Sequence, residues 1–196
     1  MKHIILITLV SIITINVFGQ SEGSKTQFKN EITITGGKFY SPYKYFQYYD
    51  AFENINLSYS HIISGKIGAL FTQGYGRMFD KNTNSRAFVI SSNISVFANV
   101  LQIKDINFRV SLGTGLEQIH IKCLYDFYPV DRHFYGIPIH LETSFEYNFS
   151  KKFFIIINAR SNYSFLFSNK NSLFVDSSYY RTWFFSTNIG IGYAFN

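Results

Sequence analysis

The stretch RTWFFSTNIGIGYAFN, residues 181–196, decides the fold class of this chain. Its odd-numbered positions carry mainly apolar and aromatic side chains, whereas its even-numbered positions carry mainly small or polar ones. This period of two is that of a β-strand with two different faces. Aromatic residues stand at both ends of the odd-numbered face and aliphatic ones in its middle, as in strands that place rings at the two membrane–water interfaces. The residues expected to face lipid are Trp183, Phe185, Ile189, Ile191, Tyr193 and Phe195.

Residues 1–19 have the pattern of a secretory signal peptide. Lys2 precedes an apolar run, and Val17 and Gly19 stand at the −3 and −1 positions of a cleavage site. The alternative is an uncleaved membrane helix, but the run is shorter than the roughly 20 residues that a helical span needs. We therefore expect a signal peptide over residues 1–19 and one exported domain over residues 20–196.

The composition is that of a chain that displays aromatic rings. Aromatic residues make up 19% of the sequence, with 22 Phe and 15 Tyr, while the mean hydropathy is only +0.01. Strands that alternate apolar and polar residues give such a near-zero mean. The net charge of +6 comes from scattered Lys and Arg residues, so nucleic acid is not an expected partner. Cys123 is the single cysteine, which excludes an internal disulfide.

The same alternation recurs in earlier segments, and the connections between them differ in length. Short turns are expected at Ser64-Gly65, Lys104-Asp105 and Ser150-Lys151. Long and short connections follow one another in strict order along the chain. The expected strands are 31–40, 54–63, 66–76, 86–100, 107–120, 136–149, 152–167 and 181–196, and the expected long loops are 41–53, 77–85, 121–135 and 168–179.

Sorting of loop length by parity is typical of outer-membrane barrels, which have short periplasmic turns and long external loops. In this pattern the chain resembles the small eight-stranded outer-membrane barrels of Gram-negative bacteria, the OmpA/OmpX-type architecture. The resemblance implies an all-β, antiparallel, up-and-down transmembrane β-barrel over residues 20–196, located in the cell outer membrane as a monomer. It also implies the outer-membrane insertion machinery as a partner, which in such barrels recognises a terminal aromatic residue. Here Phe195 is followed by Asn196.

If the apolar face points to lipid, ionisable residues of three central strands point into the barrel. An eight-stranded barrel is just wide enough for side chains to fill it. Charges buried there must be paired, because an isolated one costs several kcal/mol or more. We therefore expect a structural network that seals the lumen. Its residues are Arg109, Glu117, His140, Glu142, Glu146 and Arg160.

An outer-membrane lipid-modifying enzyme, an acyl hydrolase or transferase, is the alternative function. Such an enzyme needs a nucleophile within hydrogen-bond reach of a base. Ser60 and His61 are adjacent on a strand and face opposite ways, and His140 and Ser144 stand about 13 Å apart along theirs. His pairs with the spacing of a metal site are also missing. We therefore expect no catalytic residue, no metal ligand and no cofactor.

The expected loops hold the candidate binding surface. Their aromatic residues could contact a protein or glycan partner, as rings do at binding hot spots, or could extend the aromatic belt among lipid head groups. Loop Lys and Arg residues could meet the phosphates of lipopolysaccharide. The expected role is therefore structural or surface-interacting, including that of an accessory to an envelope or secretion assembly. The third reading is a soluble lipocalin-like carrier. The candidate binding residues are Tyr43, Tyr45, Tyr48, Tyr49, Tyr125 and Tyr128.

Overall fold

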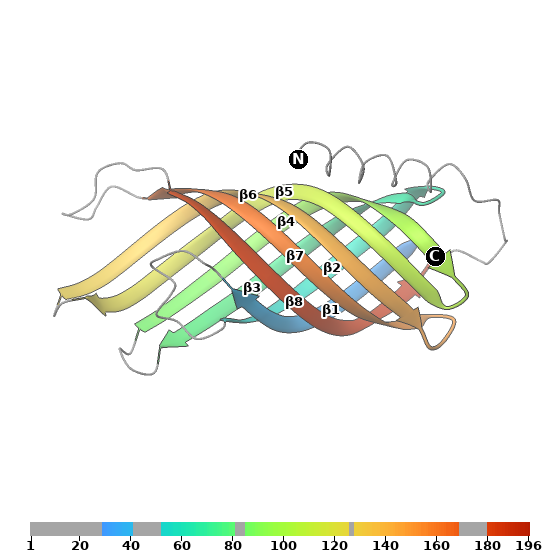
Figure 1. Ribbon diagram of the computed structural model, residues 1–196, viewed down its shortest axis with the longest axis horizontal. Coiled ribbons are helices and arrows are strands. Elements are labelled where there is room, and N and C mark those ends of the chain that lie inside the picture. The colour runs from blue at the N-terminus through green and yellow to red at the C-terminus, as the bar shows by residue number, and fades with distance from the viewer. Residues whose placement is uncertain (1–28, 41–51, 81–84, 126–127, 169–179) are drawn as a thin grey trace, which may run out of the picture.

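The fold is a closed barrel of eight antiparallel strands, in agreement with the prediction (Figure 1). Each strand pairs with the next, and β8 closes the barrel by pairing with the whole length of β1. The computed structural model describes residues 29–40, 52–80, 85–125, 128–168 and 180–196. The strands are β1 Asn30–Tyr40, β2 Phe52–Ser64, β3 Ile67–Asp80, β4 Ser85–Ile103, β5 Ile106–Tyr125, β6 Tyr128–Asn148, β7 Phe153–Ser168 and β8 Tyr180–Phe195. No helix in this part of the chain is long and apolar enough to cross a membrane.

The two ends of the barrel differ. One end, here called the turn end, holds the start of β1, the end of β8 and the tight connections β2–β3, β4–β5 and β6–β7. These are the three short turns that the sequence predicts. Gly65 and Lys104 adopt positive φ values of 54° and 50° there, as tight hairpin turns require. The opposite end is called the loop end.

At the loop end the strands run further than the sequence indicates. The prediction of long loops at 77–85 and 121–135 is wrong, because β3 and β4 stay paired as far as Asp80 and Ser85, and β5 and β6 as far as Tyr125 and Tyr128. Figure 1 shows the β5–β6 hairpin reaching beyond the other strands at this end. A strand that leaves the bilayer no longer needs an apolar outer face. At this end the alternation is inverted, with Ile119 and Ile121 of β5 buried in the barrel and Lys122 exposed outside, so the lipid-facing pattern stops before the strand does.

The outer face of the barrel is apolar. On β8 the side chains of Trp183 and Ile189 are 48% and 60% exposed, while Thr182 and Phe184 on the other face are almost fully buried. On β8, aromatic side chains lie towards both ends of the outer face and aliphatic ones lie between them. Trp183, Phe185, Ile189, Ile191 and Tyr193 all lie on the exposed outer face, and Phe195 is partly exposed there.

The interior is polar over much of its length, with apolar clusters towards both ends. Towards the loop end, Phe39 and Phe184 stack with ring centroids 4.8 Å apart within a larger apolar cluster. Towards the turn end, Ile62, Leu70 and Phe97 form a second cluster. Leu70 interrupts the alternation of β3 for this reason: it points inward and fills the barrel. A third apolar cluster at the turn end contains Phe154, Ile156 and Ala194.

The membrane-facing assignment of the apolar band can be tested, because the cost of a charge on this face depends on its depth in the bilayer. Ile189 lies at the middle of the β8 outer face, so an arginine there would have to enter the hydrocarbon core. We expect Ile189→Arg to lower the free energy of unfolding in phospholipid vesicles by roughly 2–4 kcal/mol.

The matched control is Ile103→Arg, the same change at an exposed site next to the β4–β5 turn. It is expected to cost about 0–1 kcal/mol, because the charge can reach water. Equal losses for the two variants in urea unfolding curves would contradict the membrane-facing assignment.

Candidate functional site

A cluster of buried ionisable groups lies inside the barrel near the turn end. Arg109 on β5 bridges two carboxylates: its Nη2 lies 2.8 Å from Glu31 Oε2 on β1, and its Nη1 lies 3.2 Å from Glu146 Oε1 on β6. Its Nε donates to Asn99 Oδ1 at 3.1 Å. The guanidinium also lies over the ring of Phe97, 4.1 Å from its centroid. A planar guanidinium with a fork of donors suits such a shared position between acids.

The Arg109–Glu31 contact links walls of the barrel that are not neighbours in the sheet. β1 pairs with β2 and β8, whereas β5 pairs with β4 and β6. The side chain of Arg109 is only 5% exposed, so its charge depends on the two carboxylates for compensation. This cluster therefore connects opposite sides of the barrel wall across the lumen. Glu31 is absent from the predicted network, because nothing local to the first strand indicates a partner 78 residues away.

A second ion pair lies nearer the middle of the barrel. Glu142 and Arg160 are register partners on β6 and β7, and the Arg160 guanidinium bonds the Glu142 carboxylate through both Nε and Nη2. Asn158 Nδ2 donates to the other carboxylate oxygen at 3.4 Å. Arg160 also reaches across the lumen to Thr72 Oγ1 on β3, at 3.5 Å. Arg160 thus pairs with Glu142, and Glu146 belongs to Arg109.

The two remaining residues of the predicted network are buried but separate from these ion pairs. Glu117 is 4% exposed and takes part in no ion pair among the residues that the structure describes. His140 is 1% exposed, and its Nε2 lies 2.7 Å from Ser95 Oγ on β4. A Cβ at Gly113, between these two strands, would come within 2.7 Å of the His140 ring, so the glycine leaves room for it.

The Ser95–His140 contact resembles a nucleophile–base pair, but its surroundings do not support catalysis. His140 Nδ1 has no hydrogen-bond partner in the described part of the chain, so no third residue orients the imidazole. Cavities of about 30 and 10 Å³ remain between the lumen side chains. Those volumes hold about one or two water molecules and no acyl chain. Ser60 and His61 lie on opposite faces of β2, as expected, and bond Glu31 and Asn30 respectively.

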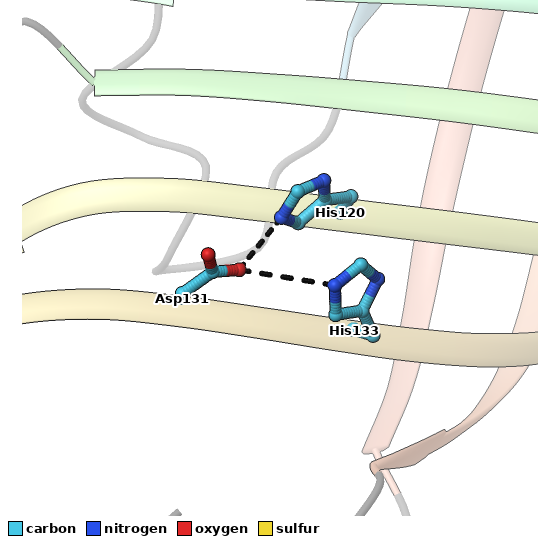
Figure 2. A group of neighbouring side chains, drawn as sticks. All are labelled: His120, Asp131 and His133. Atoms are coloured by element: carbon cyan, nitrogen blue, oxygen red, sulfur yellow. Dashed lines mark hydrogen bonds and ion pairs between the residues drawn. The ribbon is translucent and has the colours of Figure 1, made fainter.

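A separate cluster lies on the outer face of the β5–β6 hairpin at the loop end. Figure 2 shows His120 and His133 side by side on the two strands, with Asp131 next to both. Asp131 Oδ1 lies 2.6 Å from His120 Nε2 and 3.8 Å from His133 Nε2. The hydrogen bond with His120 lowers the pKa of the Asp131 carboxyl below its ordinary value. The other carboxylate oxygen lies 3.5 Å from Lys122 Nζ.

This outer cluster was missed because sequence spacing alone does not reveal it. His120 and His133 are distant in sequence, and the predicted loop at 121–135 hid the hairpin that makes them register partners. Of the candidate binding residues, Tyr125 and Tyr128 are backbone partners at the tip of that hairpin. Tyr43, Tyr45, Tyr48 and Tyr49 lie outside the described residues.

The Arg160–Glu142 pair yields a prediction about stability. Arg160→Met should leave Glu142 as an uncompensated buried charge and lower the free energy of unfolding by about 3–5 kcal/mol. The double variant Arg160→Met with Glu142→Gln should recover much of that loss, because no net charge then remains buried. Urea unfolding in detergent micelles measures both values.

The matched control is the exposed Arg77–Glu53 pair, whose side chains are 52% and 69% exposed. Arg77→Met should cost no more than about 1 kcal/mol. If Arg160→Met is as mild as Arg77→Met, the lumen pair is not the buried structural contact described here.

Comparison with known proteins places the fold. No protein-family model and no curated protein matches the sequence. Neisserial surface protein A is 13% identical and superposes with a TM-score of 0.53 over 89% of this chain and 100% of its own. Ail, the attachment invasion locus protein of Yersinia pestis, is 14% identical, with a TM-score of 0.56 over 87% and 100%.

A major outer membrane protein from Thermus thermophilus is 8% identical, with a TM-score of 0.54 over 85% of this chain and 99% of its own. At such identities the likeness shows the fold alone. The chain therefore has the fold of the small outer-membrane β-barrels, in which the strands are embedded in the membrane.

Proposed function

We propose that this protein is a monomeric barrel of the outer membrane with a non-conducting lumen, and that it has a structural or surface-interaction role. The filled interior is the observation that carries this proposal. Ion pairs lie inside the barrel from its middle towards the turn end, and apolar clusters lie towards each end. The two cavities described between the lumen side chains hold only about one or two waters each. A barrel without a passage acts through its outer surfaces, which are the lipid-facing band and the loop end.

Two parts of the outer face, the apolar band and the loop end, support a location in a membrane. The apolar band suits acyl chains, which disfavours the lipocalin-like reading, since a soluble carrier needs a polar exterior. Beyond the band, Arg77, Arg86 and Lys122 are exposed at the loop end, and Arg86 and Lys122 are cross-strand partners. Such cations suit the phosphate groups of lipopolysaccharide in the outer leaflet.

The loop end is the part of the molecule that a partner outside the cell would meet. The β5–β6 hairpin extends furthest there, as Figure 1 shows, and offers strand surface beyond the bilayer. A second structure of Ail of Yersinia pestis, which matches this chain with a TM-score of 0.52, is a complex with the heparin analogue sucrose octasulfate. By analogy, we infer a protein or glycan partner at the loop end of this barrel. The buried Ser95–His140 pair gives no reason to propose an enzyme.

Fractionation followed by reconstitution tests the proposal. The chain would be expressed in a Gram-negative host, its membranes separated on a sucrose gradient, and the protein reconstituted from the outer-membrane fraction into planar bilayers. We expect recovery with the outer membrane and no conductance steps, because the lumen is filled. Recovery from the periplasm would favour a carrier, and steady single-channel steps would refute the sealed lumen.

A further inference from the structure

The cluster formed by His120, Asp131 and His133 has the composition of a metal site. Two imidazoles and one carboxylate form a donor set that suits Zn²⁺ and Cu²⁺, whereas Mg²⁺ and Ca²⁺ prefer sites built from oxygen ligands alone. Lys122 contacts the same carboxylate but offers no ligand atom while it is protonated. The donor set is supplied by the hairpin alone, so its formation depends only on the β5–β6 register.

Strand register explains why the three side chains converge. His120 and His133 are directly opposite each other, so their Cβ atoms point to the same face. Asp131 is two residues before His133 and therefore shares that face. The two imidazole rings stack with centroids 4.0 Å apart and planes inclined by 17°. In this arrangement the Nε2 atom of each ring faces the Asp131 carboxylate (Figure 2).

The distances are close to those of a coordinated ion. One ligand atom from each residue can be chosen so that all three lie within 4.8 Å of one another. Ligands that bind Zn²⁺ at about 2.0–2.2 Å in a tetrahedron are themselves roughly 3.3 Å apart. Asp131 Oδ1 lies 2.6 and 3.8 Å from the two histidine Nε2 atoms, one slightly too near and one slightly too far. Small side-chain rotations would therefore bring the three ligands into range.

The surroundings favour an accessible and correctly charged site. The side chains of His120, His133 and Asp131 are 27%, 44% and 52% exposed, so an ion can enter and keep water in its remaining position. Lys122, next to Asp131 Oδ2, leaves Oδ1 directed at the imidazoles. Neighbouring groups of this kind orient a metal-binding carboxylate.

We propose that His120, Asp131 and His133 bind one divalent transition-metal ion, of which Zn²⁺ is the test case, on the outer face of the β5–β6 hairpin. Three protein ligands leave at least one coordination position open to water or to a donor atom from a partner. The site lies two residues beyond the exposed ring of Tyr135, on the loop-end side. It is independent of the proposed function, because it requires only the hairpin and its register.

Zinc titration by calorimetry tests the proposal on the untagged protein, purified in detergent and freed of metal. We expect the wild-type protein to bind one equivalent of Zn²⁺. His133→Ala or His120→Ala removes one direct ligand and should weaken Zn²⁺ binding at least tenfold. Even the loss of a residue that only hydrogen-bonds a metal ligand typically costs about tenfold or more in affinity. Both residues are partly exposed, so the barrel should keep its heat-modifiable migration on a detergent gel.

The matched control is His61→Ala. His61 is a partly exposed histidine at the turn end, where it bonds Asn30, far from the cluster. This variant should bind Zn²⁺ as the wild type does. Absence of stoichiometric Zn²⁺ binding by the wild type would overturn the proposal. An affinity unchanged in His133→Ala, or lowered equally in His61→Ala, would overturn it as well.

Discussion

Closure of the sheet between β1 and β8 is the constraint on which the rest of the structure depends. Hydrocarbon offers no hydrogen-bond partner, so each backbone N–H and C=O group within a bilayer must be satisfied by the protein. The pairing of the first and last strands, from Asn30 with Phe195 to Tyr40 with Phe185, removes the two free edges that an open sheet would leave. Once the sheet is closed, every strand has one face towards lipid and one towards the lumen.

The side chains on the inner face must fill a narrow interior that includes charged groups, and the sequence achieves this in two ways. Where polar side chains meet, Arg109 pairs with Glu31 and Glu146 and Arg160 pairs with Glu142, whereas Glu117 is buried apart from these pairs. Towards the ends, apolar residues take over the inner face and fill the barrel. The interior therefore has the character of a protein core that contains buried ion pairs, and small residues such as Gly113 admit larger neighbours.

Some of this architecture can be predicted from the sequence because it follows from local pattern. The alternation in β8 and β6 predicts that these segments are strands and which side chains share a face. Gly65 marks a turn that needs a positive φ. Other features depend on contacts that no local pattern contains. Arg109 meets Glu31 across the lumen only because the barrel is closed and narrow. Leu70 is an apolar residue on the inner face of β3, where the alternation predicts a polar one. Its contact with Ile62 and Phe97 explains it, and that contact exists only in the folded barrel.

The outer cluster illustrates a different limit. Beyond the lipid-facing band the alternation of β5 is inverted, because Ile119 and Ile121 lie inside the barrel while His120 and Lys122 lie on its outer face. The outer face there is polar, so this part of the strand resembles a loop in sequence. The hairpin register that pairs Tyr125 with Tyr128 also pairs His120 with His133. A correct position for that turn would have brought the two histidines together from sequence alone. The aromatic residues at 41–51 lie outside the described part of the chain, so their role stays a prediction.

The single tryptophan of the chain gives the most direct test of the central claim, which is that the apolar stripe faces acyl chains. Trp183 is 48% exposed on the outer face and stacks with Phe185 near the loop end. Its fluorescence would be measured in vesicles that contain brominated phospholipids, and separately with acrylamide in the water. The account predicts strong quenching by the brominated acyl chains and weak quenching by acrylamide. Strong quenching by acrylamide with none by the brominated lipids would contradict it.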